Sequence, residues 1–196
     1  MRFAIFLIGA TCLMGQTVST SDDPHPISSK ERLQWVMMGT VGPQTLFAES
    51  VTSAFGTWTN SPREYGTHWD GWGKRIGLDV STSALSHTLE AGVGAAWGED
   101  PRYPRLGEGT FKSRSWNVIK MTVLARNRNG NLMPAYSRFI ATPATEAISN
   151  AWRPGSQITV KDTERRIALD FLGRMAGNAW AEFWPDLKEH VFHKHQ

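Results

Sequence analysis

Hydrophobic and polar residues follow a helical period over most of the chain. The segment after Asp162 shows this most clearly, because a polar stripe at a spacing of four residues runs opposite an apolar face; the stripe comprises Arg166, Asp170, Arg174, Asn178 and Glu182. Opposite charges four residues apart are typical of an exposed helix surface. A second stripe at the same spacing comprises Arg75, Asp79, Ser83 and His87. We therefore expect helices that bury their apolar faces and leave charged ridges outside.

Local signals predict two short helices near the start of the domain. Ser28 and Glu31 have the spacing of a capping box, so a helix is expected from there through Met38, ending near Gly39. A second helix is expected over 43–55. The preceding residues 21–27 are polar and contain two prolines, which is typical of a linker.

A longer helical pattern follows and ends at Trp97. Ser61 can cap this helix, Pro62 suits its first turn, and Glu64 completes a second capping box. We expect a break around 71–73, where two glycines flank a tryptophan.

Prolines and turn residues set the expected limits of the remaining helices. A helix that begins near Ser113 or Ser115 should end before the turn at 127–131, which is rich in asparagine. The next helix is expected over 134–152, with a kink at Pro143. Pro185 should end the last long helix, and a short tail helix should follow it.

Small residues recur at a spacing of four and predict close contacts between helices. The rows are Gly73, Gly77 and Ser81; Gly173, Gly177 and Ala181; and Ala147 and Ala151. Such rows let helix backbones approach one another. The predicted fold class is therefore all-α: a compact multi-helix bundle with Gly/Ala-mediated packing, forming a single domain over 28–196.

The N-terminus has the pattern of a secretory signal. Arg2 precedes an apolar run over 3–14 that is too short for a permanent membrane anchor, so we expect a signal peptide over 1–20. The residues before Cys12 depart from the usual lipoprotein pattern, which favours cleavage after Gly15 over lipidation of the cysteine. The predicted location is the periplasm or the periphery of the outer membrane, and the mature chain should contain no thiol.

Charge changes this picture only locally. The formal net charge of +3 is too small to indicate a nucleic-acid-binding protein. Over 101–140, however, Glu108 is the one acidic residue among eight basic ones: Arg102, Arg105, Lys112, Arg114, Lys120, Arg126, Arg128 and Arg138. This excess could attract an anionic surface. We expect it to form a solvated basic face rather than a dedicated site.

Four short segments together resemble an uncharacterised family of exported bacterial proteins. The segments are Gly98-Glu99-Asp100-Pro101-Arg102-Tyr103, Ser113-Arg114, Ile148-Ser149-Asn150 and Glu182-Phe183-Trp184-Pro185-Asp186. The Asp-Pro-Arg-Tyr and Phe-Trp-Pro-Asp pieces are the most specific, and the resemblance extends over about 56–186. It implies export and a helical fold, but it supplies no activity. Pro104 stands where the family pattern leads us to expect an aromatic residue.

Catalytic chemistry has weak candidates in this sequence. Asp79, Ser83 and His87 contain the groups of a hydrolytic triad, but along one helix they form a line rather than a triad. Asp79, His87 and Glu90 are the candidates for a hydrolase site near His87. The last two have a spacing that metal ligands can have, but no partner motif accompanies them, so no metal and no cofactor is expected.

Two motifs at helix ends are the expected binding sites, because each combines a charge, a proline and an aromatic ring. The candidate binding residues are Asp100, Arg102, Tyr103, Arg114, Trp184 and Asp186. An arginine there could hold an anion bidentately. The same residues could instead cap helices and pack on the core, which we consider the stronger interpretation.

Three hypotheses for function follow. The first is a non-enzymatic envelope protein that contacts anionic lipid or another envelope protein through its basic face. The second is a membrane-embedded helical assembly in which the glycine rows mediate oligomeric contacts. The third is the hydrolase near His87. The histidines at 190, 193 and 195 are expected to form an exposed tail.

Overall fold

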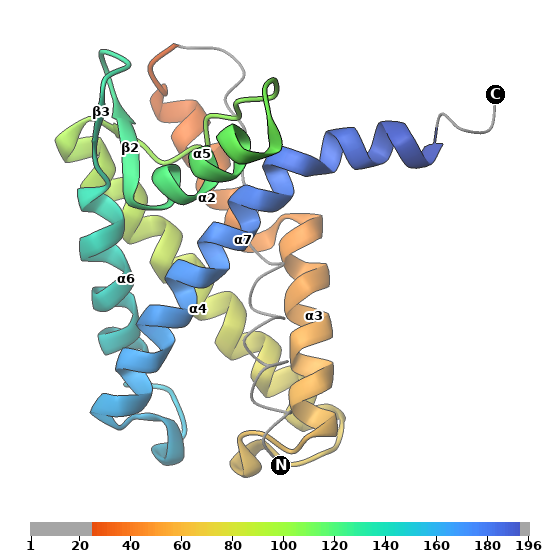
Figure 1. The fold of residues 1–196 in the computed structure, drawn as a ribbon. Helices are drawn as coiled ribbons and strands as arrows, with labels where there is room; N and C mark the ends of the chain where they lie inside the picture. Colours follow the sequence, from red (N-terminus) through yellow and green to blue (C-terminus); the bar gives the residue numbers. More distant parts are fainter. Residues whose placement is uncertain (1–24, 193–196) are drawn as a thin grey trace.

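The computed structural model describes residues 25–192 as a helical bundle with one small sheet (Figure 1). The predicted signal peptide, most of the linker, and His193 and His195 lie outside the described residues. Within them the elements follow the order α2 (Ser29–Val41), α3 (Pro43–Trp58), α4 (Trp69–Trp97), β1 (Glu99–Asp100), α5 (Phe111–Val123), β2 (Leu124–Asn127), β3 (Leu132–Pro134), α6 (Tyr136–Ser149) and α7 (Val160–Phe192). The prediction of a helical bundle is confirmed.

Helix α2 begins where the sequence predicts. The Ser28 hydroxyl accepts the backbone N–H of Glu31 at 3.3 Å, and the Glu31 carboxylate accepts the backbone N–H of Ser28 at 2.8 Å. This reciprocal pair satisfies two N–H groups that a helix start otherwise leaves open. Gly42 then ends α2, and Pro43 occupies the first turn of α3.

Helix α4 departs from the prediction at both Ser61 and Gly71. Ser61 and Pro62 form a turn that leads into a short 3-10 helix over Arg63–Tyr65, and α4 begins only at Trp69. It then continues without a break to Trp97. Gly71 is buried, and a Cβ there would lie 2.2 Å from the carbonyl oxygen of Tyr65. The glycine therefore serves a close backbone approach rather than a helix break.

A small antiparallel sheet, in the order β1-β2-β3, was not predicted. The predicted turn at 127–131 is present and joins β2 to β3, with Gly130 at a φ of 79°. The strands are two to four residues long, too short for an alternating pattern to stand out. The sheet places the loop after β1 beside the end of α5.

Helix α7 extends further than predicted. It runs through Pro185 to Phe192, so the expected end at Pro185 is wrong. In Figure 1 its C-terminal part turns away from the bundle. Ionic contacts hold the helix on both sides of the proline: Arg114 pairs with Glu182 and also with Asp186. These contacts explain why the loss of one backbone hydrogen bond does not end the helix.

The orientation of the helices is the reverse of the predicted one. In both polar stripes, residues point inward: Arg75, His87, Asn178 and Glu182 are all buried. The expectation of charged ridges outside is therefore wrong. Among the largest side chains that are fully buried, four are glutamates, namely Glu90, Glu99, Glu146 and Glu182. The hydrophobic cluster, by contrast, centres on Tyr103, Val118 and Met121 alone.

Helix α4 is central and contacts α2, α3 and α6, while α5 packs on α7. Glycine mediates close packing at positions both inside and outside the predicted rows. In the row on α7, Gly173 and Gly177 are buried, and Ala181 packs against the hydrophobic cluster. A Cβ at Gly39 would lie 2.3 Å from Nε2 of His87, and one at Gly94 would lie 3.0 Å from Arg32. Gly73 and Gly77 meet nothing within 4 Å, so their row faces outward. The row that contains Ala147 is also exposed.

Candidate functional site

The three candidate catalytic residues lie on α4 and take different partners. Asp79 accepts a hydrogen bond from the Ser53 hydroxyl at 3.2 Å. Glu90 is fully buried between Arg138 and Arg174. Burial would raise the pKa of Glu90, but the two arginines outweigh that effect and hold its pKa below the usual value. Glu90 is therefore an ionised structural carboxylate rather than a proton donor.

His87 is a packing residue between α4 and α2. Its Nδ1 lies 2.8 Å from the carbonyl oxygen of Ser83, so Nδ1 carries the proton that this bond requires. Its Nε2 points at the notch left by Gly39, and its ring lies 4.9 Å from that of Trp35. Burial lowers the pKa of His87 and favours the neutral ring. Nε2 itself faces α2 at Gly39.

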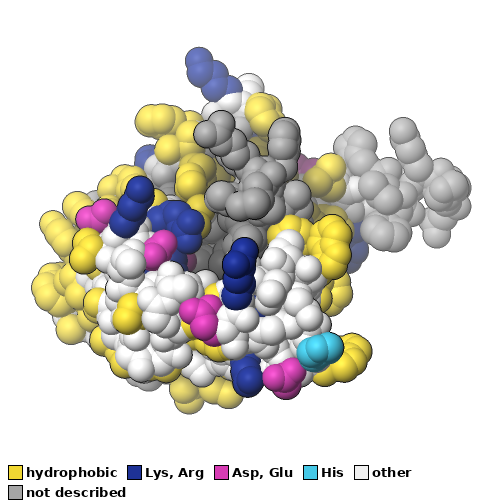
Figure 2. Space-filling view, turned by 90° about the horizontal axis from the view of Figure 1, so that it is seen from below, with side chains coloured by type: hydrophobic (Ala, Val, Ile, Leu, Met, Phe, Trp, Pro, Cys, Tyr) yellow, Lys and Arg dark blue, Asp and Glu magenta, His cyan; other side chains and the backbone are white. Residues whose placement is uncertain are grey.

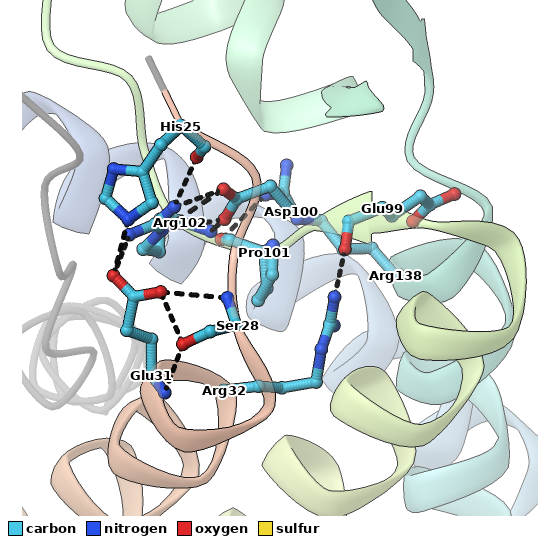
Figure 3. Close-up of polar contacts among 9 residues, drawn as sticks. All are labelled: His25, Ser28, Glu31, Arg32, Glu99, Asp100, Pro101, Arg102 and Arg138. Carbon is cyan, nitrogen blue, oxygen red and sulfur yellow. Dashed lines mark hydrogen bonds and ion pairs between the residues drawn. The ribbon is translucent and has the colours of Figure 1, made fainter. Parts of the chain in front are cut away.

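Asp100 and Arg102 form one compact cluster, which Figure 3 shows. Arg102 Nη2 lies 2.7 Å from Asp100, and its Nη1 lies 3.2 Å from Glu31. The same guanidinium donates to the carbonyl oxygen of His25 at 3.2 Å. Hydrogen bonds from Ser28 and His25 lower the pKa of Glu31 to about 2. The cluster fastens the chain before α2 to the loop after β1.

Tyr103, Arg114 and Asp186 belong to a second cluster that is centred on Glu182. The Tyr103 hydroxyl donates to Glu182 at 2.7 Å, Arg114 Nε donates to it at 2.9 Å, and the backbone N–H groups of Leu106 and Gly107 each donate at 3.0 Å. Burial opposes ionisation of Glu182, but these donors outweigh burial and lower its pKa. The donors named here already have an internal acceptor, so they are not available to an external anion.

These clusters join segments that carry the resemblance noted above. Tyr103 and Arg114 come from two of those segments, and Glu182 comes from a third. Trp184, the remaining candidate, instead stacks on Trp180, with ring centroids 4.4 Å apart. The sequence reasoning left Glu182 out of the candidate site. Two signals could have found it: its place in the polar stripe of α7, whose orientation was misjudged, and its place at the start of the segment that ends at Asp186.

The basic stretch over 101–140 does not form one solvated face. Arg114 and Arg138 are buried, and Arg102 is nearly so; all three bind acidic partners within the chain. Arg105 pairs with Asp186 at 2.9 Å. The remaining basic residues are Lys112, Lys120, Arg126 and Arg128. The surface available to an anion is therefore much less basic than the sequence count indicates.

The outer surface is instead rich in large hydrophobic side chains. They occur on every α-helix that the structure describes, and among the most exposed are Phe47, Trp58, Trp69, Phe111, Trp116 and Val160. Seen from below in Figure 2, hydrophobic side chains gather along the edges of the bundle, with charged groups between them. Within 25–192, no helix has both the length and the hydropathy required to cross a membrane.

Several tryptophans contribute to this surface; Trp116, Trp180 and Trp184 lie within helices, and others lie at helix ends. Trp58 is the last residue of α3, Trp69 is the first of α4, and Trp97 is the last of α4. All three are more than half exposed. Trp152 follows the end of α6 and is also exposed. In Figure 1 the end of α3, the start of α4 and the end of α6 lie at the lower end of the bundle, and the end of α4 lies at the upper end.

Comparison of the chain with protein-family models, with curated proteins and with solved structures finds no match. The candidate function therefore depends on the geometry of the chain itself.

Proposed function

We propose that the protein is exported to the cell envelope and binds a lipid layer there, in a non-enzymatic role, through its exposed apolar side chains. The observation that carries this proposal is the inverted distribution of side chains. Charged groups fill the interior, while large apolar groups cover the outside. Soluble monomers rarely expose large contiguous apolar surfaces, and such surfaces commonly mark contact with a membrane or a partner.

The interior chemistry supports lipid as the apolar partner. In an apolar solvent, burying apolar groups gives no driving force, so helices associate through polar contacts and close packing. Glu90, Glu146 and Glu182 each lie within the bundle and each pairs with arginine. Polar residues that face inward and satisfy one another are what a lipid environment favours.

The tryptophans support the same partner. Tryptophan favours the boundary between hydrocarbon and water, because its ring is apolar while its N–H can still donate a hydrogen bond. Trp58 and Trp69 at one end of the bundle, and Trp97 at the other, have this placement. Acyl chains, rather than anionic headgroups, are thus the main contact in this proposal.

Flotation with vesicles tests the proposal. Full-length protein is mixed with phosphatidylcholine vesicles, with and without phosphatidylglycerol, and floated in 0.1 M and about 1 M salt, where the screening length falls to about 3 Å. The expected result is flotation with both compositions that persists in high salt. Release by salt, or flotation only with the anionic lipid, would overturn the proposal in favour of a basic-face contact.

Matched variants separate the two contacts. The combined change Val51→Ser, Ile148→Ser and Leu172→Ser removes exposed apolar groups from α3, α6 and α7, and should reduce flotation. The control change Lys112→Gln and Lys120→Gln removes two basic groups and should leave flotation unchanged. Absence of flotation together with a stable oligomer in buffer would mean that other copies of the chain cover the apolar faces, and would refute lipid binding.

A further inference from the structure

Helices α3, α4, α6 and α7 line a partly open cavity of about 260 Å³. Many of its lining residues carry polar or charged side chains, which is unusual for the interior of a helical bundle. Four carboxylates from four helices line it: Glu49 from α3, Asp79 from α4, Glu146 from α6 and Asp170 from α7. Glu146 forms ion pairs with two arginines, whereas the other three form no ion pair within residues 25–192. The proposed lipid contacts are made by side chains on the outside of the bundle and do not involve this cavity.

Two of these three carboxylates bond to hydroxyl groups, and the arginines near Asp79 and Asp170 act on them without a direct hydrogen bond. The Ser83 hydroxyl donates to Glu49 Oε1 at 2.7 Å, and the Ser53 hydroxyl donates to Asp79 Oδ2 at 3.2 Å. Burial raises the pKa of Glu49 to about 7 and that of Asp79 to about 6. Burial and the nearby Glu146 raise the pKa of Asp170 to about 7. In the empty cavity all three are thus poised to take up or release protons near neutral pH.

The basic groups around the cavity are already engaged. Arg75 donates to three backbone carbonyl groups in the turn before α4, at 2.8 to 3.0 Å. Arg153 and Arg166 hold Glu146, and Arg174 holds Glu90. Arg165 lies 3.6 Å from Asp162, one turn earlier on α7. His87, the remaining titratable neighbour, bonds to a carbonyl oxygen within α4.

Unused acceptor atoms line the same cavity. Glu49 Oε2, Thr145 Oγ1 and Gln157 Oε1 are buried and have no hydrogen-bond partner within the described part of the chain. The Glu49 side chain belongs to a residue that is only 7% exposed, and Thr145 is 1% exposed. A buried polar atom without a partner costs about 1–3 kcal/mol, so such a group calls for an explanation. Gln157 Oε1 can only accept, Thr145 Oγ1 can accept or donate, and Glu49 Oε2 accepts once its carboxyl is ionised, so a ligand that carries donors would satisfy all three.

We propose that the cavity is a binding site for a small organic cation that carries several N–H donors, such as an aliphatic diamine. Its ammonium groups would form the direct ion pairs that Glu49, Asp79 and Asp170 lack within residues 25–192, and they would donate to the free oxygens. A metal ion fits less well, because no group of three metal-ligating His, Cys, Asp or Glu side chains comes together within residues 25–192. Binding requires the carboxylates to ionise, so protons leave as the cation enters.

Calorimetry with 1,4-diaminobutane tests this site in the full-length protein. Binding is expected at pH 8 and should weaken by at least about tenfold at pH 5.5, because Glu49, Asp79 and Asp170 then hold protons. Repeating the titration near pH 6.5, where these carboxyls still hold part of their protons, in two buffers of different ionisation enthalpy should reveal proton release. The neutral analogue 1,4-butanediol, which has the same length but no charge, is the ligand control and should bind more weakly.

Variants locate the binding. Glu49→Gln and Asp170→Asn should each weaken diamine binding by about tenfold, the factor that corresponds to 1.4 kcal/mol. Asp70→Asn is the matched control, because Asp70 is an exposed acid on α4 that pairs with Lys74 outside the cavity. Circular dichroism of each variant checks the fold. No binding to folded wild-type protein, equal binding of butanediol, or equal effects of Glu49→Gln and Asp70→Asn would overturn the proposal and leave water as the occupant of the cavity.

Discussion

Replacing Glu49 by glutamine should stabilise the empty protein, because it removes a buried ionisable group. Burial raises the pKa of this carboxyl from 4.5 to about 7. One pH unit of such a shift corresponds to about 1.4 kcal/mol, so the charged side chain costs the folded state up to about 3 kcal/mol at pH 8. Glutamine keeps an acceptor for Ser83 and carries no charge.

The size of this stabilisation depends on pH. Below pH 4.5 the carboxyl is protonated in both the folded and the unfolded chain, so the variant and the wild type should have similar free energies of unfolding. Between pH 4.5 and 7 the folded state keeps a proton that the unfolded chain releases, so wild-type stability falls as pH rises. The advantage of Glu49→Gln should therefore grow over this range and level off above pH 7.

Urea unfolding in mild detergent, followed by circular dichroism at pH 4.5, 6 and 8, measures this advantage. The expected gain is near zero at pH 4.5 and about 1–3 kcal/mol at pH 8. Asp70→Asn, which changes an exposed acid, should show no comparable gain. A Glu49→Gln protein that is less stable than wild type at pH 8, or whose gain is the same at pH 4.5 and pH 8, would refute the reasoning. Adding 1,4-diaminobutane should narrow the gap at pH 8.

Three further substitutions test the packing of the bundle by urea unfolding at pH 7. Glu182→Gln should cost about 3–5 kcal/mol, because it removes the buried carboxylate charge to which Arg114, Tyr103 and two backbone N–H groups donate; a cost below 1 kcal/mol would contradict this. Gly39→Ala should cost about 1–3 kcal/mol through a clash with His87, and His87→Ala should relieve the clash in the double variant. Gly77→Ala should instead stabilise the protein by about 0.5–1 kcal/mol, because its Cβ would meet nothing; a clear loss would show that this row packs after all.

The sequence predicts those features of the fold that depend on neighbouring residues. The capping box of Ser28 and Glu31 determines the start of α2 because both partners lie within one turn. The turn at 127–131 was likewise predicted from its own residues. Features that depend on distant contacts were not. Pro185 lies inside α7, and the Arg114 contacts that hold the helix on either side of it come from another helix.

The orientation of the helices could not be predicted from periodicity. A stripe such as Arg166, Asp170 and Arg174 shows that a helix has two different faces, but the period is the same whichever face turns inward. The prediction of exposed ridges assumed that the chain folds in water. The partners that decide otherwise, Glu90 for Arg174 and Glu146 for Arg166, lie 84 and 20 residues away along the chain.

The candidate site was found only in part for the same reason. The motifs around Arg102 and Tyr103 stand out in the sequence, and the structure places both in polar clusters. Glu49, by contrast, sits in a helix with few charges and has no motif around it. Its importance comes from the cavity that it shares with Asp79 and Asp170, and that cavity exists only once the helices pack.

Spin labelling tests most directly whether the apolar side chains of the bundle face lipid while its polar side chains face inward. Cys12 is the single cysteine in the sequence, so labels can be attached to Ile148→Cys, Ser149→Cys or Leu172→Cys in a Cys12→Ser background. Ile148 and Leu172 are exposed, whereas Ser149 is fully buried beside Ile148 on α6. In lipid vesicles, labels at 148 and 172 should be mobile and more accessible to oxygen than to a water-soluble nickel complex, and the label at 149 should be immobile and accessible to neither. A mobile, water-accessible label at 149 with immobile labels at 148 and 172 would contradict the account.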